Sequence, residues 1–126
     1  MKISTVLAVV PVLLAMSVAA EAACVYPQAP QSLPNGSQAT ADEMKAANAQ
    51  VKEYSKTVQE VYLPCLEQEK QESISALDSA ASDYAARKAS IESIQAKKHN
   101  AALDELQALA ARWNSEIKAF KDKGAK

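Results

Sequence analysis

The side chains best suited to chemistry in this 126-residue sequence are two cysteines, Cys24 and Cys65, and one histidine, His99. In an exported chain an even pair of cysteines is typical of a disulfide. The two cysteines lack the CxxC spacing and the adjacent cationic residue of a reactive thiol pair. We therefore predict a structural Cys24–Cys65 disulfide, which leaves no cysteine to act as a nucleophile beside His99.

No catalytic or metal-binding constellation accompanies His99. A di-iron Glu-x-x-His motif needs a glutamate where Ala96 stands. The two glycines, Gly36 and Gly124, are too few for a Gly-rich phosphate loop. We interpret the acidic run EQEKQE at 67–72 as a solvated helix face, because a straight helix offers no converging cage of oxygens. The sequence predicts no catalytic residue, metal site or cofactor, and hence no enzyme; a site built on His99 and nearby carboxylates is the alternative.

The N-terminal 22 residues have the pattern of a signal peptide. Lys2 precedes the apolar run Val6–Val18, and Ala20-Glu21-Ala22 fits the small-x-small cleavage pattern. The run is shorter than the roughly 20 residues of a membrane span. We therefore expect cleavage before Ala23 and a periplasmic or secreted protein. Two alternatives stay open: an uncleaved anchor, and a lipid on Cys24, although Glu21 replaces the aliphatic residue usual at lipid-attachment sites.

The charge balance limits the classes of partner. The formal net charge is −1 at pH 7, whereas nucleic-acid binding depends on many Lys and Arg that neutralise phosphates. The polar helix faces mix both charge signs, unlike the basic faces of membrane-surface helices. We expect no nucleic-acid partner, and membrane contact only if Cys24 carries a lipid anchor.

Helical signals fill the chain after residue 39. Thr40 and Glu43 form a capping box, which predicts a helix that begins near Ala41. Apolar residues then recur at alternating steps of three and four, as in a heptad seam: Met44, Ala47, Val51, Tyr54, Val58, Val61 and Cys65. Lysines gather near the other end, where we expect the last helix to stop near Asp122 and Gly124 to close it.

The helical region must fold back on itself. One helix over 40–122 would be about 120 Å long and could not bury its own apolar stripe. Ser and Asp favour caps and turns, so we place the reversal at Asp78–Asp83, with Ser82 as the cap of the second helix. The predicted fold is all-α, a long antiparallel coiled-coil-like hairpin over 40–122 with a short tail at 123–126. A three-helix arrangement, with a further break near 98–100, is the alternative.

Pro64 interrupts the first predicted helix. It removes one backbone hydrogen bond and clashes with the preceding turn, so we expect a kink. The alternative is that one helix ends at Tyr62 and another begins with Pro64 in its first turn.

Residues 23–39, called the strap below, read as an extended proline-rich segment. Prolines at 27, 30 and 34 stiffen it, and Asn35-Gly36 favours a turn because both residues tolerate positive φ. Extended polyproline II from Cys24 to Thr40 spans about 50 Å. The helix from Thr40 to Cys65 spans about 37 Å. The strap is therefore long enough to run back along the helix and bring Cys24 level with Cys65, where a disulfide would contribute about 4 kcal/mol.

A two-helix hairpin of this size tends to dimerise into a four-helix bundle or to be covered by another element. We therefore expect a protein partner or self-association as a homodimer. The candidate interface consists of apolar and aromatic residues of the two helices: Val51, Tyr54, Val58, Tyr62, Leu106, Trp113 and Ile117.

Several short motifs resemble those of a family of small exported proteobacterial helical proteins with no assigned activity. These motifs are C-x2-P-x2-P-x3-P-N-G-x2-A-T-x2-E-M from Cys24, V-K-x-Y, Y-L-x-C-L, H-N-A-A-L-D-E-L and W-N. The resemblance covers Cys24 to about Phe120 and implies a periplasmic, mostly helical protein. It carries over no catalytic residue, and Asn100 and Asn114 only match polar positions of the second helix. The sequence does not indicate a specific biochemical role.

Overall fold

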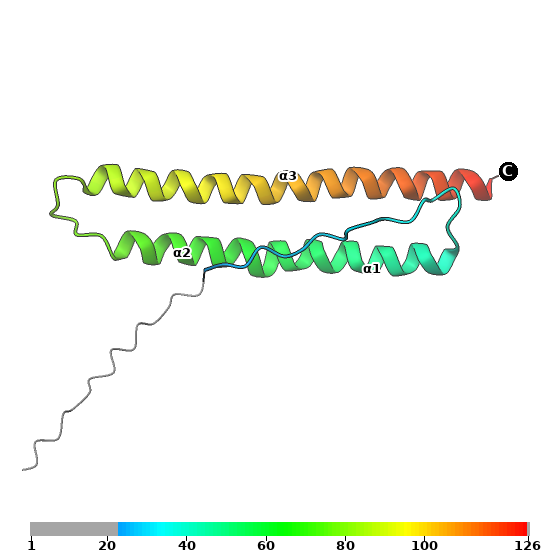
Figure 1. The fold of residues 1–126 in the computed structure, drawn as a ribbon, viewed down its shortest axis with the longest axis horizontal. Helices are drawn as coiled ribbons and strands as arrows, with labels where there is room; N and C mark the ends of the chain where they lie inside the picture. The colour runs from blue at the N-terminus through cyan, green and yellow to red at the C-terminus, as the bar shows by residue number, and fades with distance from the viewer. Residues whose placement is uncertain (1–22, 126) are drawn as a thin grey trace, which may run out of the picture.

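A computed structural model describes residues 23–125, and the predicted all-α class is confirmed for this part of the chain, which contains no strand (Figure 1). The predicted signal peptide, 1–22, and Lys126 lie outside the described residues. The elements are α1 (Ala41–Thr57), the π-helical turn η1 (Val58–Tyr62), α2 (Leu63–Ser75) and α3 (Tyr84–Gly124).

The helices form two adjacent rods. In the first rod α1, η1 and α2 follow one another, and α3 runs back beside them in the opposite direction (Figure 1). The strap starts beside α2, where Cys24 is bonded to Cys65, and passes along α1 to the far end, where it turns into α1 (Figure 1). The strap therefore lies against the half of the molecule formed by α1 and the C-terminal half of α3.

The capping box at the start of α1 is confirmed. The Glu43 amide donates to Thr40 Oγ1 at 3.2 Å, and the Thr40 amide donates to Glu43 Oε2 at 2.7 Å. These bonds satisfy backbone donors that the first helical turn would otherwise leave free. The hydrogen bond from the Thr40 backbone also lowers the pKa of the Glu43 carboxyl.

The reversal between the rods occupies residues 76–83, which includes the predicted segment. The predicted cap is wrong: Asp83, not Ser82, is the N-cap of α3, and no side chain caps the helix. The Asp83 carboxylate instead accepts from Arg87 at 2.7 Å, one turn into α3. The further break near 98–100 does not occur, because α3 is continuous.

The C-terminal end of α3 also departs from the prediction. The helix continues through Gly124, two residues beyond Asp122, and Ala125 is its C-cap in right-handed helical geometry. No described glycine has a positive φ, so Gly124 is an ordinary helical residue and does not close the helix as a C′ residue.

Pro64 is accommodated by a change of helical pitch. The Leu63 amide donates to Val58 O, five residues back, so the turn before Pro64 is a π turn. Proline has no N–H and its ring clashes with the carbonyl four residues back. Widening the preceding turn relieves this clash, and Pro64 falls in the first turn of α2.

The π turn adds one residue to the first rod and shifts the buried seam by one position. Up to Val58 the seam follows the predicted heptad, but beyond it Tyr62 and Leu66 are buried, with 7% and 3% of their surfaces exposed. Val61, predicted to lie on the seam, is 62% exposed. Cys65 is only partly buried and points toward the strap, to which it is bonded. The heptad prediction is therefore wrong for these last two positions.

Two hydrophobic clusters form the core. The central cluster contains Tyr54, Val58, Tyr62, Leu66, Ala102 and Leu109, and the strap residues Cys24, Ala29 and Leu33 pack on it. The end cluster contains Ala39, Met44, Ala47 and Trp113. Between residues 67 and 94, part of the described range, no side chain is fully buried. The core is thus concentrated where the strap covers the helix pair.

Candidate functional site

The predicted disulfide is confirmed and fixes the free end of the strap. Cys24 and Cys65 are bonded, their Cα atoms are 5.8 Å apart, and 41 positions separate them in the sequence. The Cys24 amide also donates to Glu69 Oε2 at 3.5 Å, one turn further along α2. The start of the strap is therefore held to the first rod both covalently and by a hydrogen bond.

Glu69 is the acceptor that joins the strap to both rods. Besides the Cys24 amide, it accepts at Oε1 from Lys98 Nζ at 3.0 Å and from Gln95 Nε2 at 3.0 Å. Lys98 contributes most to lowering the pKa of the Glu69 carboxyl, and Gln95 and the Cys24 amide add to the shift. Gln95 is 8% exposed, and its other amide atom, Oε1, has no hydrogen-bond donor among the described residues.

Tyr26, two residues after Cys24, contacts both rods near the start of the strap. Its hydroxyl donates to Glu105 Oε2 at 2.5 Å and lies 2.8 Å from the Tyr54 hydroxyl. Its ring meets the Tyr62 ring edge-on, with centroids 5.0 Å apart. Burial, and then the hydrogen bond to the Glu105 carboxylate, raise the pKa of the Tyr26 hydroxyl far above its usual value. Burial also raises the pKa of Tyr54. Tyr26 is therefore held as the neutral donor.

The strap reverses at Asn35, as predicted, but the reason for Gly36 differs from the prediction. The Asn35 carbonyl accepts from the Gln38 and Ala39 amides at 3.0 and 2.8 Å. Gly36 has no positive φ. Instead it is buried against α3, where an added Cβ would lie 1.9 Å from the Glu116 carbonyl oxygen. Glycine is needed here because two backbones come into contact.

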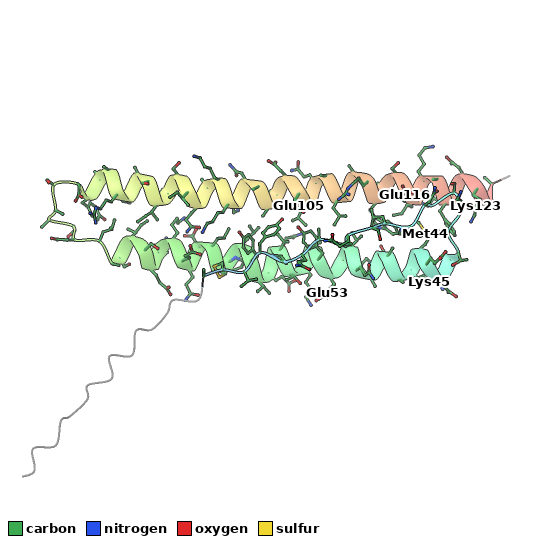
Figure 2. The ribbon with its side chains drawn as sticks, viewed as in Figure 1. Met44, Lys45, Glu53, Glu105, Glu116 and Lys123 are labelled. Carbon is green, nitrogen blue, oxygen red and sulfur yellow. A yellow bond between two sulfur atoms is a disulfide. The ribbon has the colours of Figure 1, made fainter. Side chains whose placement is uncertain are left out.

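The turn is anchored to α3 by two polar contacts. The Gly36 amide donates to Glu116 Oε2 at 2.6 Å, and Lys123 Nζ donates to the Ala39 carbonyl at 2.6 Å. Lys123 also lies over the Phe120 ring, 5.0 Å from its centroid. Figure 2 shows Glu105 and Glu116 on the side of α3 along which the strap passes. Carboxylates of α2 and α3 therefore receive donors near both ends of the strap, from Cys24, Tyr26 and Gly36.

The seven residues of the predicted interface do not form one exposed surface. Tyr54, Val58, Tyr62 and Trp113 are buried within the chain, and the Trp113 indole donates to Asn48 Oδ1 at 3.3 Å. The other three residues, Val51, Leu106 and Ile117, are partly buried. Most of the aromatic stripe therefore packs the two rods and the strap together within the single chain.

The helix pair is hollowed along a face that the strap does not reach. One hollow of about 580 Å³ is lined by Val51, Ser55, Gln59, Leu63, Leu103, Leu106, Gln107, Leu109 and Ala110. A second, of about 480 Å³, is lined by Leu63, Leu66, Glu67, Lys70, Glu92, Gln95, Ala96, His99 and Asn100. Leu63 lines both hollows, so they form one groove between the rods; the residues of both sets are called the groove face below.

The larger hollow of the groove face lacks charged side chains, whereas Glu67, Lys70 and Glu92 line the smaller one. The larger hollow is lined only by apolar, hydroxyl and amide side chains. Elsewhere the helices carry charged pairs one turn apart, such as Lys56–Glu60 and Lys118–Asp122. Depletion of charge together with partly buried apolar residues is typical of the centre of a protein–protein interface.

His99 is exposed and lines the smaller hollow. Among residues 23–125 no group of three His, Cys, Asp or Glu side chains is placed to hold a metal ion. None of the helices in the same range has the length and apolar character needed to cross a membrane.

Comparison of the chain with protein-family models, curated proteins and solved structures finds no match. The fold and the site define a class only: an all-helical, disulfide-bonded protein with a groove between its two rods. Sequence reasoning missed Tyr26, Glu69 and Glu105, which clamp the strap, and the amides of the groove face. The position of Tyr26 beside the first proline of the strap was the available signal for that residue. The roles of Glu69, Glu105 and the groove-face amides depend on which side of the helix pair the strap occupies, and the sequence does not show this.

Proposed function

We propose that this protein is a non-enzymatic, exported helical protein that acts through protein–protein contacts in the cell envelope, in the periplasm or after secretion. The observation that carries the proposal is the larger hollow of the groove face, about 580 Å³ between the two rods and lined by no charged side chain. A pair of cysteines bonded to each other fits an oxidising compartment. The resemblance to small exported proteins points in the same direction.

The arrangement of the two rods and the strap suits a contact protein. We propose a coiled-coil-like antiparallel hairpin whose strap seals one side and leaves the groove face open. A rigid surface loses little conformational entropy when it binds, which favours recognition without a mobile loop. Cleavage of residues 1–22 before Ala23 completes this proposed mature form.

Photo-crosslinking in intact cells tests the proposal. A photoreactive amino acid at Gln107, in the groove, is compared with one at Ala111, an exposed residue one turn further along α3. We expect a crosslinked protein product from Gln107 and little or none from Ala111. Equal products at both positions, or none at either, would contradict a groove-face contact.

A lipid-anchored or membrane-surface envelope component is the alternative. It requires the sulfur of Cys24 to carry a lipid, and a sulfur bonded to Cys65 has no valence left for one. Intact mass of the protein purified from cells separates the two. A mass that equals the chain from Ala23 less two hydrogen atoms supports the disulfide form, and an added diacylglyceryl mass supports the anchor.

A further inference from the structure

We propose that a hollow beside the disulfide is a binding site for the α-ammonium group that cleavage before Ala23 creates on the mature chain. The hollow has a volume of about 360 Å³, and its lining includes Ala23, the Cys24–Cys65 disulfide and the α2 carboxylates Glu69 and Glu72. The inference rests on the cleavage in the proposed mature form, and it assigns a role to the charge that this cleavage produces.

The side chains of the strap carry no charge. Residues 23–39 include no Asp, Glu, Lys, Arg or His. The donors that the strap offers to the helices are the Cys24 amide, the Tyr26 hydroxyl and the Gly36 amide, and all three donate to carboxylates. The strap therefore lies with uncharged donors on acidic side chains, and the charge that it can gain is the one on its own first nitrogen.

Cleavage of the leader supplies this charge. Hydrolysis of the peptide bond between Ala22 and Ala23 by a signal peptidase consumes one water molecule. It leaves a carboxylate on Ala22 and an amino group on Ala23, which is mostly protonated at neutral pH. Before cleavage the same nitrogen belongs to a neutral amide. Processing therefore adds one positive charge at the first atom of the strap.

The new ammonium group lies within electrostatic reach of the hollow. The Cys24 amide nitrogen is 3.5 Å from Glu69 Oε2. Because one residue spans at most about 3.6 Å of chain, the Ala23 nitrogen is no more than about 7 Å from the same oxygen. This separation is shorter than the Debye length of about 8 Å at physiological ionic strength. An ammonium group has three donors, which can reach a carboxylate directly or through water.

Glu72 is the carboxylate with charge to spare. Glu69 Oε1 accepts from Lys98 of α3 at 3.0 Å, so Lys98 offsets the charge of Glu69. Glu72 makes no ion pair with another described residue, and its Oε1 accepts from Gln68 of its own helix at 2.7 Å. Lys98 reaches the hollow only through Glu69, and the strap adds no charged side chain. The mature ammonium group therefore pairs mainly with Glu72.

This site couples the docking of the strap to export. The start of the strap is then held by the disulfide, by the Cys24 amide and by the ammonium group, all within two residues. Disulfides form in oxidising compartments outside the cytosol, and the ammonium group exists only after the leader is removed. Before export the strap has neither the covalent nor the ionic attachment.

NMR titration of the mature protein tests the site. The protein is expressed from its complete reading frame, and intact mass verifies that it begins at Ala23. The Ala23 methyl shift is followed from about pH 6 to 10, the range in which an α-amino group titrates. A synthetic peptide of residues 23–31 carrying Cys24→Ser gives the reference, because it has the same first residue without helices or thiol. We expect the pKa in the protein to be higher than in the peptide by about half a pH unit, because a nearby carboxylate favours the charged form.

Two matched variants assign the effect to Glu72. Glu72→Gln removes the charge and keeps an oxygen for Gln68, and it should remove at least about half of the rise in pKa. Glu67→Gln removes the same charge from α2, but on the side that lines the smaller hollow. It should change the pKa by less than half as much as Glu72→Gln does.

Several results would overturn the inference. They are a pKa in the protein equal to that in the peptide, equal effects of Glu72→Gln and Glu67→Gln, and a mature chain that begins at a residue other than Ala23. The contact function has a separate readout, because the Gln107 crosslink does not involve the Ala23 amine. A Gln107 crosslink with a peptide-like pKa would remove only this inference, and a raised pKa without a crosslink would remove only the contact function.

Discussion

Replacing Gly36 with alanine separates two explanations of the strap turn. If glycine were present only to ease turn formation, Gly36→Ala would be neutral or stabilising by about 0.4–1 kcal/mol, because the φ here is not positive and alanine restricts the unfolded chain. If glycine is present because the strap touches α3, the same change must destabilise the protein. The sign of the change in the free energy of unfolding therefore decides between them.

The structure sets the size of the effect. The added Cβ would lie 1.9 Å from the Glu116 carbonyl oxygen, 2.8 Å from its carbonyl carbon and 3.0 Å from the Phe120 amide nitrogen. All three are backbone atoms of a helix and cannot rotate away, so the strap itself must move. Overpacking of this kind costs about 1–3 kcal/mol. Displacing the turn also weakens the bond from the Gly36 amide to the Glu116 carboxylate, which adds about 1–2 kcal/mol.

Urea unfolding followed by circular dichroism measures the result, with the disulfide intact. We expect Gly36→Ala to lose about 2–5 kcal/mol of the free energy of unfolding. Gly124→Ala is the matched control, because nothing lies within 4 Å of the added Cβ and the residue is helical. It should gain up to about 0.5 kcal/mol. A Gly36→Ala protein as stable as the wild type would refute the close approach of the strap to α3.

Three further predictions concern the strap and the helix start. Replacing Cys24 and Cys65 with serine opens a crosslink across 41 positions and should cost about 4 kcal/mol in urea unfolding; a loss below about 1 kcal/mol would contradict the account. The pKa of Tyr26 is raised in the folded chain, so above pH 10.0 the unfolded chain loses the hydroxyl proton while the folded chain keeps it. The free energy of unfolding should therefore fall as the pH rises above 10.0. Tyr26→Phe should flatten that part of the pH profile, and an unchanged profile would rule out the clamp. Thr40→Ala should lose about 1 kcal/mol through its cap, and no loss would show that the box is dispensable.

Local signals made much of the fold predictable. The helix start at Ala41 follows from hydrogen bonds between residues three apart, and the disulfide follows from having two cysteines and a strap of adequate length. The seam was predictable only to Val58. Beyond it the positions of Val61 and Cys65 depend on how Pro64 is accommodated, and a π turn moves every later residue around the rod.

The candidate site was less predictable than the fold. The aromatic stripe gave the residues that pack, such as Tyr54 and Trp113, but not which side of the helix pair stays open. That side is decided by where the strap lies, and the strap is placed by long-range contacts of Tyr26, Gly36 and Glu69. Periodicity within one helix carries no information about such contacts.

The most direct test of the central claim, that the strap lies against one side of the helix pair, is the distance between two tyrosine rings. In the oxidised protein the Tyr26 and Tyr62 ring centroids are 5.0 Å apart. Two-dimensional NMR should therefore show nuclear Overhauser contacts between their ring protons, with Tyr62→Phe used to assign them. The account would be contradicted if these contacts were absent and the Tyr26 ring protons had the chemical shifts of an unstructured peptide.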